Sequence, residues 1–185
     1  RPYGITTDGT NLYVADTNSH TIRQIGIDNK SVTTLAGTVG DNGSANGVGT
    51  AASFYFPMGI TTDGTNLYVA DKDNDLIRQI VISTKAVTTL AGGGSGVGTD
   101  GTGTTASFNS PTGITTDGTN LYVADYDNHK IRKIGIDNRS VTTLAGTGTG
   151  GSTNGAGSGA DSVARFKNPA GITTDGIDLY VIEKS

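Results

Sequence analysis

The sequence contains no cysteine and no tryptophan, and only one methionine, one glutamate and four prolines among its 185 residues. Without cysteine there can be no disulfide framework, no thiolate-bound zinc or iron–sulfur cluster, and no thiol nucleophile. The near absence of glutamate, together with abundant threonine, glycine and aspartate, disfavours helices and favours strands and turns. The composition therefore predicts an all-β protein.

Long apolar runs and clusters of basic residues are also missing. No stretch approaches the roughly 18 apolar residues of a membrane-spanning helix, so we expect no membrane insertion. The 13 lysines and arginines are scattered singly, and the formal net charge is -4. Nucleic-acid binding favours clustered basic side chains, so we expect no nucleic-acid partner.

The main positive feature is an internal repeat. The hexapeptide GITTDG occurs at residues 4–9, 59–64, 113–118 and 171–176. Each of the first three copies is followed, at a constant distance, by VTTLAG, so all length variation falls after VTTLAG. We expect one repeat-built domain, residues 1–185, with three full repeats and part of a fourth at residues 2–56, 57–110, 111–168 and 169–185.

Each repeat predicts four short strands. In the first repeat they are residues 5–7, 12–15, 22–27 and 32–36, which are rich in β-branched residues and separated by turn residues. Both faces of these strands carry small or apolar side chains, as expected for a sheet packed between two other sheets. The pattern predicts a β-propeller segment of about three four-stranded blades plus two strands of a fourth.

A long link joins each VTTLAG to the next repeat. Its first half is rich in Gly, Ser, Asn and Thr, and we expect that half to be mobile. Its second half repeats Ala-x-Phe-x-x-Pro. We expect the three phenylalanines to anchor the link against the blades and the proline to fix the start of the inner strand. The anchors are Phe54, Phe108 and Phe166.

The combination of A-x-F-x-x-P-x-G-I, LYVAD, IR[QK]I and VTTLAG resembles the NHL-repeat family, in the long-period form of bacterial multi-repeat proteins. The resemblance implies a six-bladed propeller that serves as a protein- or ligand-binding scaffold. Some members of this family are lyases, relatives act as hydrolases, and animal versions can bind RNA. Together with the cysteine-free composition, the resemblance implies a bacterial protein that is extracellular or on the cell surface.

Three blades and two strands cannot close a ring. The chain begins at Arg1, with neither a methionine nor a signal segment. We expect a longer parent protein to supply the remaining blades upstream. The alternative is self-association through open blade edges, into a ring or a fibre.

The loops between the second and third strands differ among repeats whose strands are almost identical. Loops on a rigid scaffold are a common binding surface, although solvated turns also vary when nothing restrains them. The candidate binding residues are Thr17, His20, Lys72, Asp73, Asp75, Tyr126, Asp127 and His129.

Two metal-like patterns occur in these loops. His20, Asp75 and His129 occupy equivalent positions, but they lie on different blades, whereas zinc needs every ligand atom about 2 Å from one ion. Asp71, Asp73 and Asp75 alternate as in a calcium loop, but the glycine and the final acidic residue of that motif are missing. We expect no metal site and no cofactor, with adventitious calcium as an open alternative.

Other charged residues recur in every blade, which indicates a structural role. An Asp-Gly pair ends each inner strand, where the carboxylate is expected to cap its own hairpin turn. An arginine of the third strand is expected to pair with the aspartate that ends the second. The turn residues are Asp8, Asp63, Asp117 and Asp175. The expected pairs are Arg23 with Asp16, Arg78 with Asp71, and Arg132 with Asp125.

No arrangement of residues typical of catalysis is present, because there is no cysteine and neither histidine lies in a recognisable triad or zinc motif. We therefore predict a non-catalytic propeller that acts as a scaffold or binding module. The alternatives are a segment of a hydrolase or lyase whose catalytic residues lie elsewhere, and a self-assembling structural protein.

Overall fold

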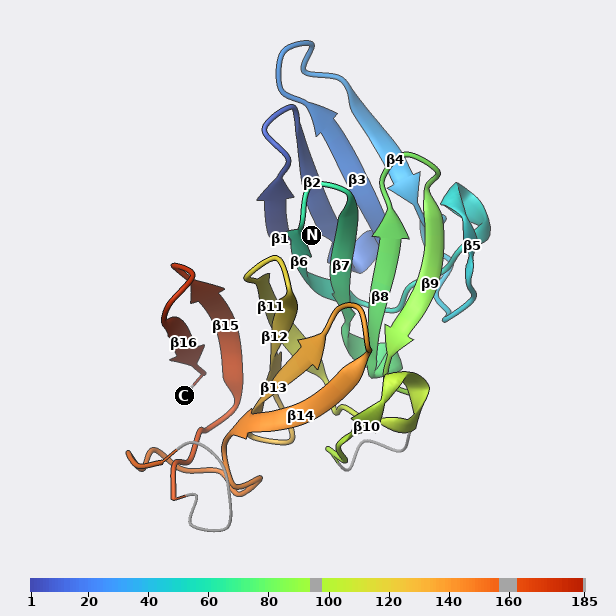
Figure 1. Ribbon diagram of the computed structural model, residues 1–185. Coiled ribbons are helices and arrows are strands. Elements are labelled where there is room, and N and C mark those ends of the chain that lie inside the picture. Colours follow the sequence, from blue (N-terminus) through green and yellow to red (C-terminus); the bar gives the residue numbers. More distant parts are fainter. Residues whose placement is uncertain (94–97, 157–162, 185) are drawn as a thin grey trace.

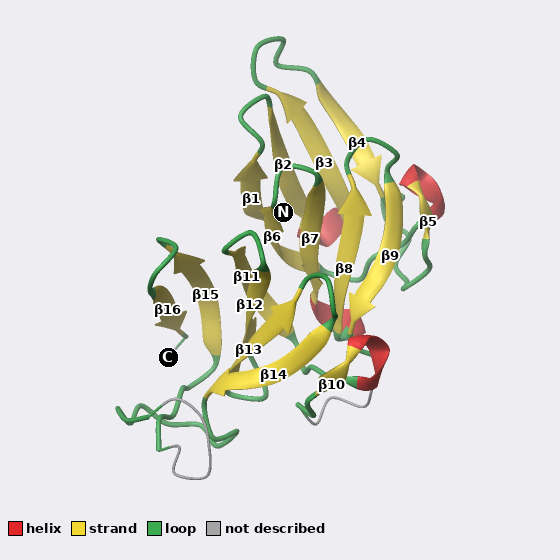
Figure 2. Cartoon of the chain, viewed as in Figure 1, coloured by secondary structure: helices red, strands yellow, loops and turns green. Residues whose placement is uncertain are grey.

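The computed structural model describes residues 1–93, 98–156 and 163–184. Antiparallel sheets dominate it, and the helices are single 3-10 turns (Figure 2). The first blade consists of β1 (Pro2–Thr7), β2 (Asn11–Asp16), β3 (Thr21–Gly26) and β4 (Val32–Ala36), hydrogen-bonded in that order.

The later blades repeat this order. The second consists of β6 (Pro57–Thr62), β7 (Asn66–Asp71), β8 (Leu76–Val81) and β9 (Ala86–Ala91). The third consists of β11 (Pro111–Thr116), β12 (Asn120–Asp125), β13 (Lys130–Gly135) and β14 (Ser140–Ala145). The described part of the fourth is the hairpin of β15 (Pro169–Thr174) and β16 (Leu179–Glu183).

The inner strands β1, β6, β11 and β15 lie side by side, each in contact with the next (Figure 1). The chain is therefore an open segment of a β-propeller with three four-stranded blades and two strands of a fourth, as predicted. No helix within the described residues is long and apolar enough to cross a membrane.

Glycine permits the close approach of the inner strands. A Cβ atom on Gly4 would lie 2.3 Å from the carbonyl oxygen of Met58, and one on Gly59 would lie 2.2 Å from that of Thr112. Any side chain at these positions would push neighbouring blades apart. The invariant glycine of GITTDG is thus required by interblade packing.

The second blade packs against its neighbours on both of its faces. We call the face turned toward the preceding blade the near face and the other the far face. Leu67 and Val69 of β7 belong to the apolar core shared with the first blade, whereas Tyr68 and Ala70 belong to the core shared with the third. For the second blade, this confirms the prediction that both faces are packed.

The link phenylalanines complete these cores. We call each interface between neighbouring blades a seam. Phe54 lies fully buried in the seam between the first and second blades, and Phe108 in the seam between the second and third, while Phe166 is half-buried. Burying apolar surface stabilises by about 25 cal/mol per Å². Because the buried apolar residues are concentrated in the seams, the contacts between blades supply most of this stabilisation.

The first link makes backbone contacts with itself and with the second blade. An isolated bridge joins Asn42 to Phe54, and β5 (Gly47–Val48) adds a short fifth strand beside β9. The second link likewise supplies β10 (Gly101–Thr102) beside β14, although its residues 94–97 lie outside the described residues. Polar residues in these links find hydrogen-bond partners on the blade, which the low-complexity composition does not reveal.

Short 3-10 turns occupy two kinds of position. Two follow the second strands of their blades, at η1 (Thr17–Ser19) and η3 (Lys72–Asn74). Two lie in the links, at η2 (Gly49–Ala51) and η4 (Gly103–Thr105). The first pair places variable residues beside the start of the neighbouring inner strand.

The Asp-Gly turns are capped by their own carboxylates. Asp8 Oδ1 accepts hydrogen bonds from the amides of Thr10 and Asn11 at 2.8 and 2.7 Å, and Oδ2 accepts one from the Tyr13 hydroxyl at 2.7 Å. Gly9 has a φ of +88°, which favours glycine. The same arrangement recurs at Asp63, Asp117 and Asp175.

Candidate functional site

An identical block of sequence separates the variable positions of the repeats. Residues 4–16, 59–71 and 113–125 all read GITTDGTNLYVAD. This block forms the inner hairpin of each blade. The residues on either side of it differ from repeat to repeat, and the hairpin brings these two flanks to the same end of the blade.

The flanks line a pocket of about 380 Å³, which we call the inner-edge pocket. Every lining residue comes from one of four flanking positions, and the identical block contributes none. The lining residues are Arg1, Tyr3, Thr17, Asn18, Phe56, Met58, Lys72, Asp73 and Lys184.

Apolar side chains form part of the pocket wall. Tyr3 is 59% exposed, and Phe56 and Met58 are half-buried. Phe56 has a φ of +49°, which is uncommon for a bulky residue. Its amide donates to His20 Nδ1 at 3.2 Å, and its ring meets the His20 ring edge-on at 4.8 Å. The seam therefore holds the Phe56 backbone and ring in place.

The charged residues of the pocket are mainly basic. Lys72 Nζ lies 2.5 Å from Asp73 Oδ1, so these two side chains form an ion pair. Within the described residues, the Arg1 guanidinium and the Lys184 ammonium form no ion pair. The pocket therefore has uncompensated positive charge.

Four of the predicted binding residues hold neighbouring blades together. Buried Thr17 donates its hydroxyl to the carbonyl oxygen of Pro57 at 2.7 Å. The other three are left-handed residues that accept a hydrogen bond from the amide preceding the next inner proline. The pairs are His20 with Phe56 at 3.2 Å, Asp75 with Ser110 at 2.7 Å, and His129 with Asn168 at 3.1 Å.

These contacts engage Nδ1 of each histidine and Oδ1 of Asp75. Burial raises the pKa of Asp75, while the Ser110 amide favours its ionised form. Within the described residues, no group of three or more His, Asp or Glu side chains lies close enough together to hold a metal ion. We therefore assign His20, Asp75 and His129 to the seams.

The remaining predicted binding residues divide between two blades. Lys72 and Asp73 line the inner-edge pocket. Their equivalents in the third blade, Tyr126 and Asp127, lie outside its lining; Asp127 is exposed and Tyr126 is half-buried. The structure thus brings together part of the predicted set and separates the rest.

Buried arginines bind the links through hydrogen bonds, an arrangement we call the arginine clamp. Arg78 Nη1 lies 3.0 Å from Asp71 Oδ2, and both side chains are fully buried. Arg78 also donates to the carbonyl oxygens of Ser53 and Ala45 at 3.1 and 3.0 Å. Its guanidinium lies 5.4 Å from the centre of the Phe54 ring. The ion pair therefore fixes the link to the second blade.

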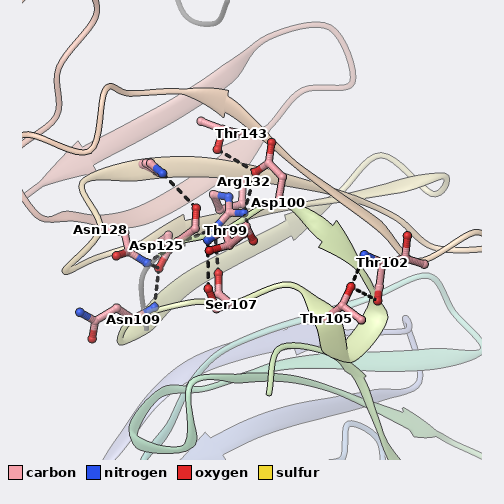
Figure 3. Close-up of polar contacts among 12 residues, drawn as sticks. Thr99, Asp100, Thr102, Thr105, Ser107, Asn109, Asp125, Asn128, Arg132 and Thr143 are labelled. Atoms are coloured by element: carbon pink, nitrogen blue, oxygen red, sulfur yellow. Dashed lines mark hydrogen bonds and ion pairs between the residues drawn. The ribbon is translucent and has the colours of Figure 1, made fainter. Parts of the chain in front are cut away.

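The third blade repeats this clamp (Figure 3). Arg132 contacts Asp125 at 2.9 Å and Asp100 at 2.8 Å, and it donates to the carbonyl oxygens of Ser107 and Thr99, both at 3.0 Å. These carboxylates and guanidinium groups are engaged in holding the link.

The first blade differs from the other two. The predicted pair of Arg23 with Asp16 is wrong. Asp16 lies 3.3 Å from the amino group of Arg1, and Arg23 donates to the carbonyl oxygen of Thr33 at 3.4 Å. In the second blade the equivalent of Asp16 is Asp71, which is fully buried. Burial raises the pKa of Asp71 to about 6, although Asn74, the Tyr55 amide and Arg78 all favour its ionised form.

Sequence reasoning missed most of the pocket. Arg1, Tyr3, Phe56 and Met58 lie just before the identical block, whereas the predicted binding residues all lie in the loops after the second strands. The available signal was the variation on either side of Pro2, Pro57, Pro111 and Pro169. Comparing the repeats position by position would have found these residues.

The family model described as NHL repeat matches residues 108–134. NHL repeat-containing protein 2 of Bos taurus is 37% identical to this chain over 144 residues, which is 72% of this chain and 20% of that protein. The chain therefore spans about a fifth of the length of the curated relatives it first matches.

Solved structures share the fold. A structural genomics protein of unknown function from Bacteroides thetaiotaomicron aligns with a TM-score of 0.76 at 23% identity, covering 98% of this chain and 44% of that one. An auxiliary nutrient binding protein from Bacteroides ovatus aligns with a TM-score of 0.72 at 17% identity, covering 97% and 45%. At these identities the likeness concerns the fold alone.

Proposed function

This chain is built from NHL repeats, and on that premise we propose that it is a non-catalytic binding module whose ligand site is the inner-edge pocket. The observation that carries the proposal is the origin of the pocket lining. All nine lining residues come from positions that differ between repeats, and the identical block supplies none. Apart from Thr17, whose hydroxyl donates to the Pro57 carbonyl oxygen across the seam, these side chains can vary with little effect on the seams.

The size and surroundings of the pocket support a small ligand or a short segment of a protein partner. Ligand pockets in proteins typically measure roughly 300–1,000 Å³ and combine apolar walls with a few polar groups. The inner-edge pocket, at about 380 Å³, lies at the lower end of that range. The auxiliary nutrient binding protein of Bacteroides ovatus has the same fold, which is consistent with a binding role.

The test is a fragment screen on the isotope-labelled 185-residue chain, followed by backbone NMR shifts. We expect bound fragments to shift the amide resonances of Tyr3, Met58 and Lys72. Their affinity should fall in the Met58→Ala variant. The fragments should be chemically unchanged after incubation with the protein. Tyr126→Ala is the matched control, because Tyr126 is the third-blade equivalent of Lys72 and lies outside the pocket lining. Shifts confined to other surfaces, or chemical conversion of the fragment, would contradict the proposal.

A second observation favours association. The near face of the first blade is open, with Ile5 60% and Val32 52% exposed, whereas the equivalent Ile60 and Val87 are 6% and 1% exposed. An exposed apolar sheet face of this kind is typical of an interface. We propose that another NHL-type blade covers this face in the functional assembly, because a blade of that type covers it in the second and third repeats.

Sedimentation equilibrium tests this second proposal. We expect the chain to associate at micromolar concentration and the variant Ile5→Asp/Val32→Asp to remain at 18.8 kDa. The double variant Thr33→Asp/Thr10→Asp, with the same added charge at exposed polar positions, is the control. A wild-type chain that stays monomeric at high concentration would refute coverage of this face by a second copy of the chain.

We also propose an extracellular or cell-surface location in a bacterium. The cysteine-free composition, rich in Thr, Gly and Asn, supports this location. Fractionation of source cells with an antibody to this chain tests it, and recovery of the protein solely from the cytoplasm would contradict it.

A further inference from the structure

We propose that the inner-edge pocket binds a small organic anion, with a carboxylate head held by basic side chains and an aromatic body held against Tyr3, Phe56 and Met58. This inference rests on the proposed function, since it names the ligand class of the same pocket.

The charge balance of the pocket supports an anion. Three of its nine lining residues are basic and one is acidic. Asp73 already pairs with Lys72, which leaves the side chains of Arg1 and Lys184 to meet a ligand. These two cations come from opposite ends of the sequence and lie beside one pocket. A carboxylate between them would gain two charge-assisted contacts.

The positive charge of the pocket is local. The chain as a whole has a net charge of -4, and the carboxylates of Asp16, Asp71 and Asp75 lie at the same end of the blades as the pocket. The attraction for an anion therefore comes from the Arg1 and Lys184 side chains at the pocket itself, and salt should weaken it.

The apolar wall supports a ring. Tyr3, Phe56 and Met58 come from β1, from the residue before β6 and from β6, so the wall is assembled across the seam between two blades. The Tyr3 ring is largely exposed, whereas the equivalent positions in the third and fourth repeats hold Thr112 and Ala170. Aromatic and thioether side chains pack well against a planar ring.

The experiment compares two probes of nearly equal shape. Naphthalene-2-carboxylate carries the charge, and naphthalene-2-carboxamide is its neutral counterpart. Affinities for the full 185-residue chain are measured by titration calorimetry at low and at high salt. We expect the carboxylate to bind about five- to tenfold more tightly than the amide at low salt, with most of that preference lost at high salt.

Variants locate the effect. Lys184→Gln should weaken carboxylate binding about two- to fivefold, the size expected for an exposed charge contact. Asp73→Asn should strengthen it by a similar factor, because it frees Lys72. The matched controls are Lys30→Gln and Asp127→Asn, which make the same charge changes outside the pocket lining and should leave both affinities unchanged.

The outcomes separate the two proposals. Equal affinity for both probes, with sensitivity to Met58→Ala, overturns the anion inference and leaves the pocket as a binding site. Carboxylate binding that ignores Met58→Ala, Lys184→Gln and Asp73→Asn places the site elsewhere and overturns both. No binding of either probe at millimolar concentration overturns the anion inference alone.

Discussion

The near faces of the first and second blades carry the same residues in different surroundings. Ile5 and Ile60 occupy the same place in identical inner hairpins, yet Ile5 is 60% exposed and Ile60 is 6% exposed. Arg78 is fully buried among link carbonyls, whereas its counterpart Arg23 donates to the carbonyl oxygen of Thr33 on the neighbouring strand of its own blade.

This difference indicates that the stability of the molecule depends on the interfaces between blades. A blade is a thin sheet, so its apolar side chains are removed from water only by the neighbouring blade and the link. The repeats therefore stabilise one another through their interfaces, as in other repeat proteins. The same substitution should be costly on a covered face and mild on the open one.

The largest contrast is expected for the arginines. Arg78→Ala leaves Asp71 buried without its partner and frees the link, so we expect a loss of about 3–5 kcal/mol in the free energy of unfolding. Arg23→Ala should cost less than about 1 kcal/mol, because it removes only exposed contacts. Urea denaturation followed by circular dichroism measures both. Similar losses for the two variants would contradict the assignment of the clamp to the covered seam.

A smaller contrast is expected for the isoleucines. Ile60→Ala opens a cavity in the core between the first two blades and should cost about 2–4 kcal/mol. Ile5→Ala should change the free energy of unfolding by less than about 1 kcal/mol. The same denaturation assay compares them, using the single variant Val32→Asp as a background that disfavours association. If Ile5→Ala costs as much as Ile60→Ala there, the first-blade face is covered within the monomer.

The smallest effect should be the same in both blades, because it is local. Burial by itself would raise the pKa of Asp8, but the Asn11 amide and the Tyr13 hydroxyl lower it to about 2. Despite burial, the same kinds of contact lower the pKa of Asp63. Since the folded pKa lies below the ordinary value of 3.8, each ionised carboxylate stabilises the fold above pH 4. That contribution is lost as the pH falls toward 2.

Asp8→Asn and Asp63→Asn test this expectation. At pH 5 each variant should be less stable than the parent by about 1 kcal/mol or less, allowing for solvent screening. The difference should shrink as the pH is lowered to 2. A much larger effect for Asp63→Asn than for Asp8→Asn would show that the turns also depend on the seam.

Most of the fold could be predicted because its determinants are local and repeated. The β-branched runs and Asp-Gly turns specify the strands, and four copies of one pattern specify a propeller. The course of the links could not be predicted in this way. Residues such as Asn46 and Asp100 become fixed only when Arg78 and Arg132 reach them from the blade.

The site was harder to predict than the fold. His20 and Asp75 look like exposed loop residues in the sequence, but a left-handed backbone turns each toward the next blade, where it accepts an amide hydrogen bond. Lys184 and Tyr3 are distant in sequence and meet only because the inner strands pack side by side. The variable positions were visible in the sequence, whereas their grouping into one pocket required the structure.

The most direct test uses two aspartates that are two residues apart. The repeated Asp71 is buried beside Arg78, and the variable Asp73 lines the pocket. Unfolding and naphthalene-2-carboxylate binding are measured on Asp71→Asn and Asp73→Asn at neutral pH. We predict that Asp71→Asn loses about 3 kcal/mol of stability. We predict that Asp73→Asn changes stability by less than about 0.5 kcal/mol and binds the carboxylate more tightly. Equal loss of stability in both variants, or unchanged binding by Asp73→Asn, would contradict the assignment of Asp71 to the buried ion pair and of Asp73 to the pocket.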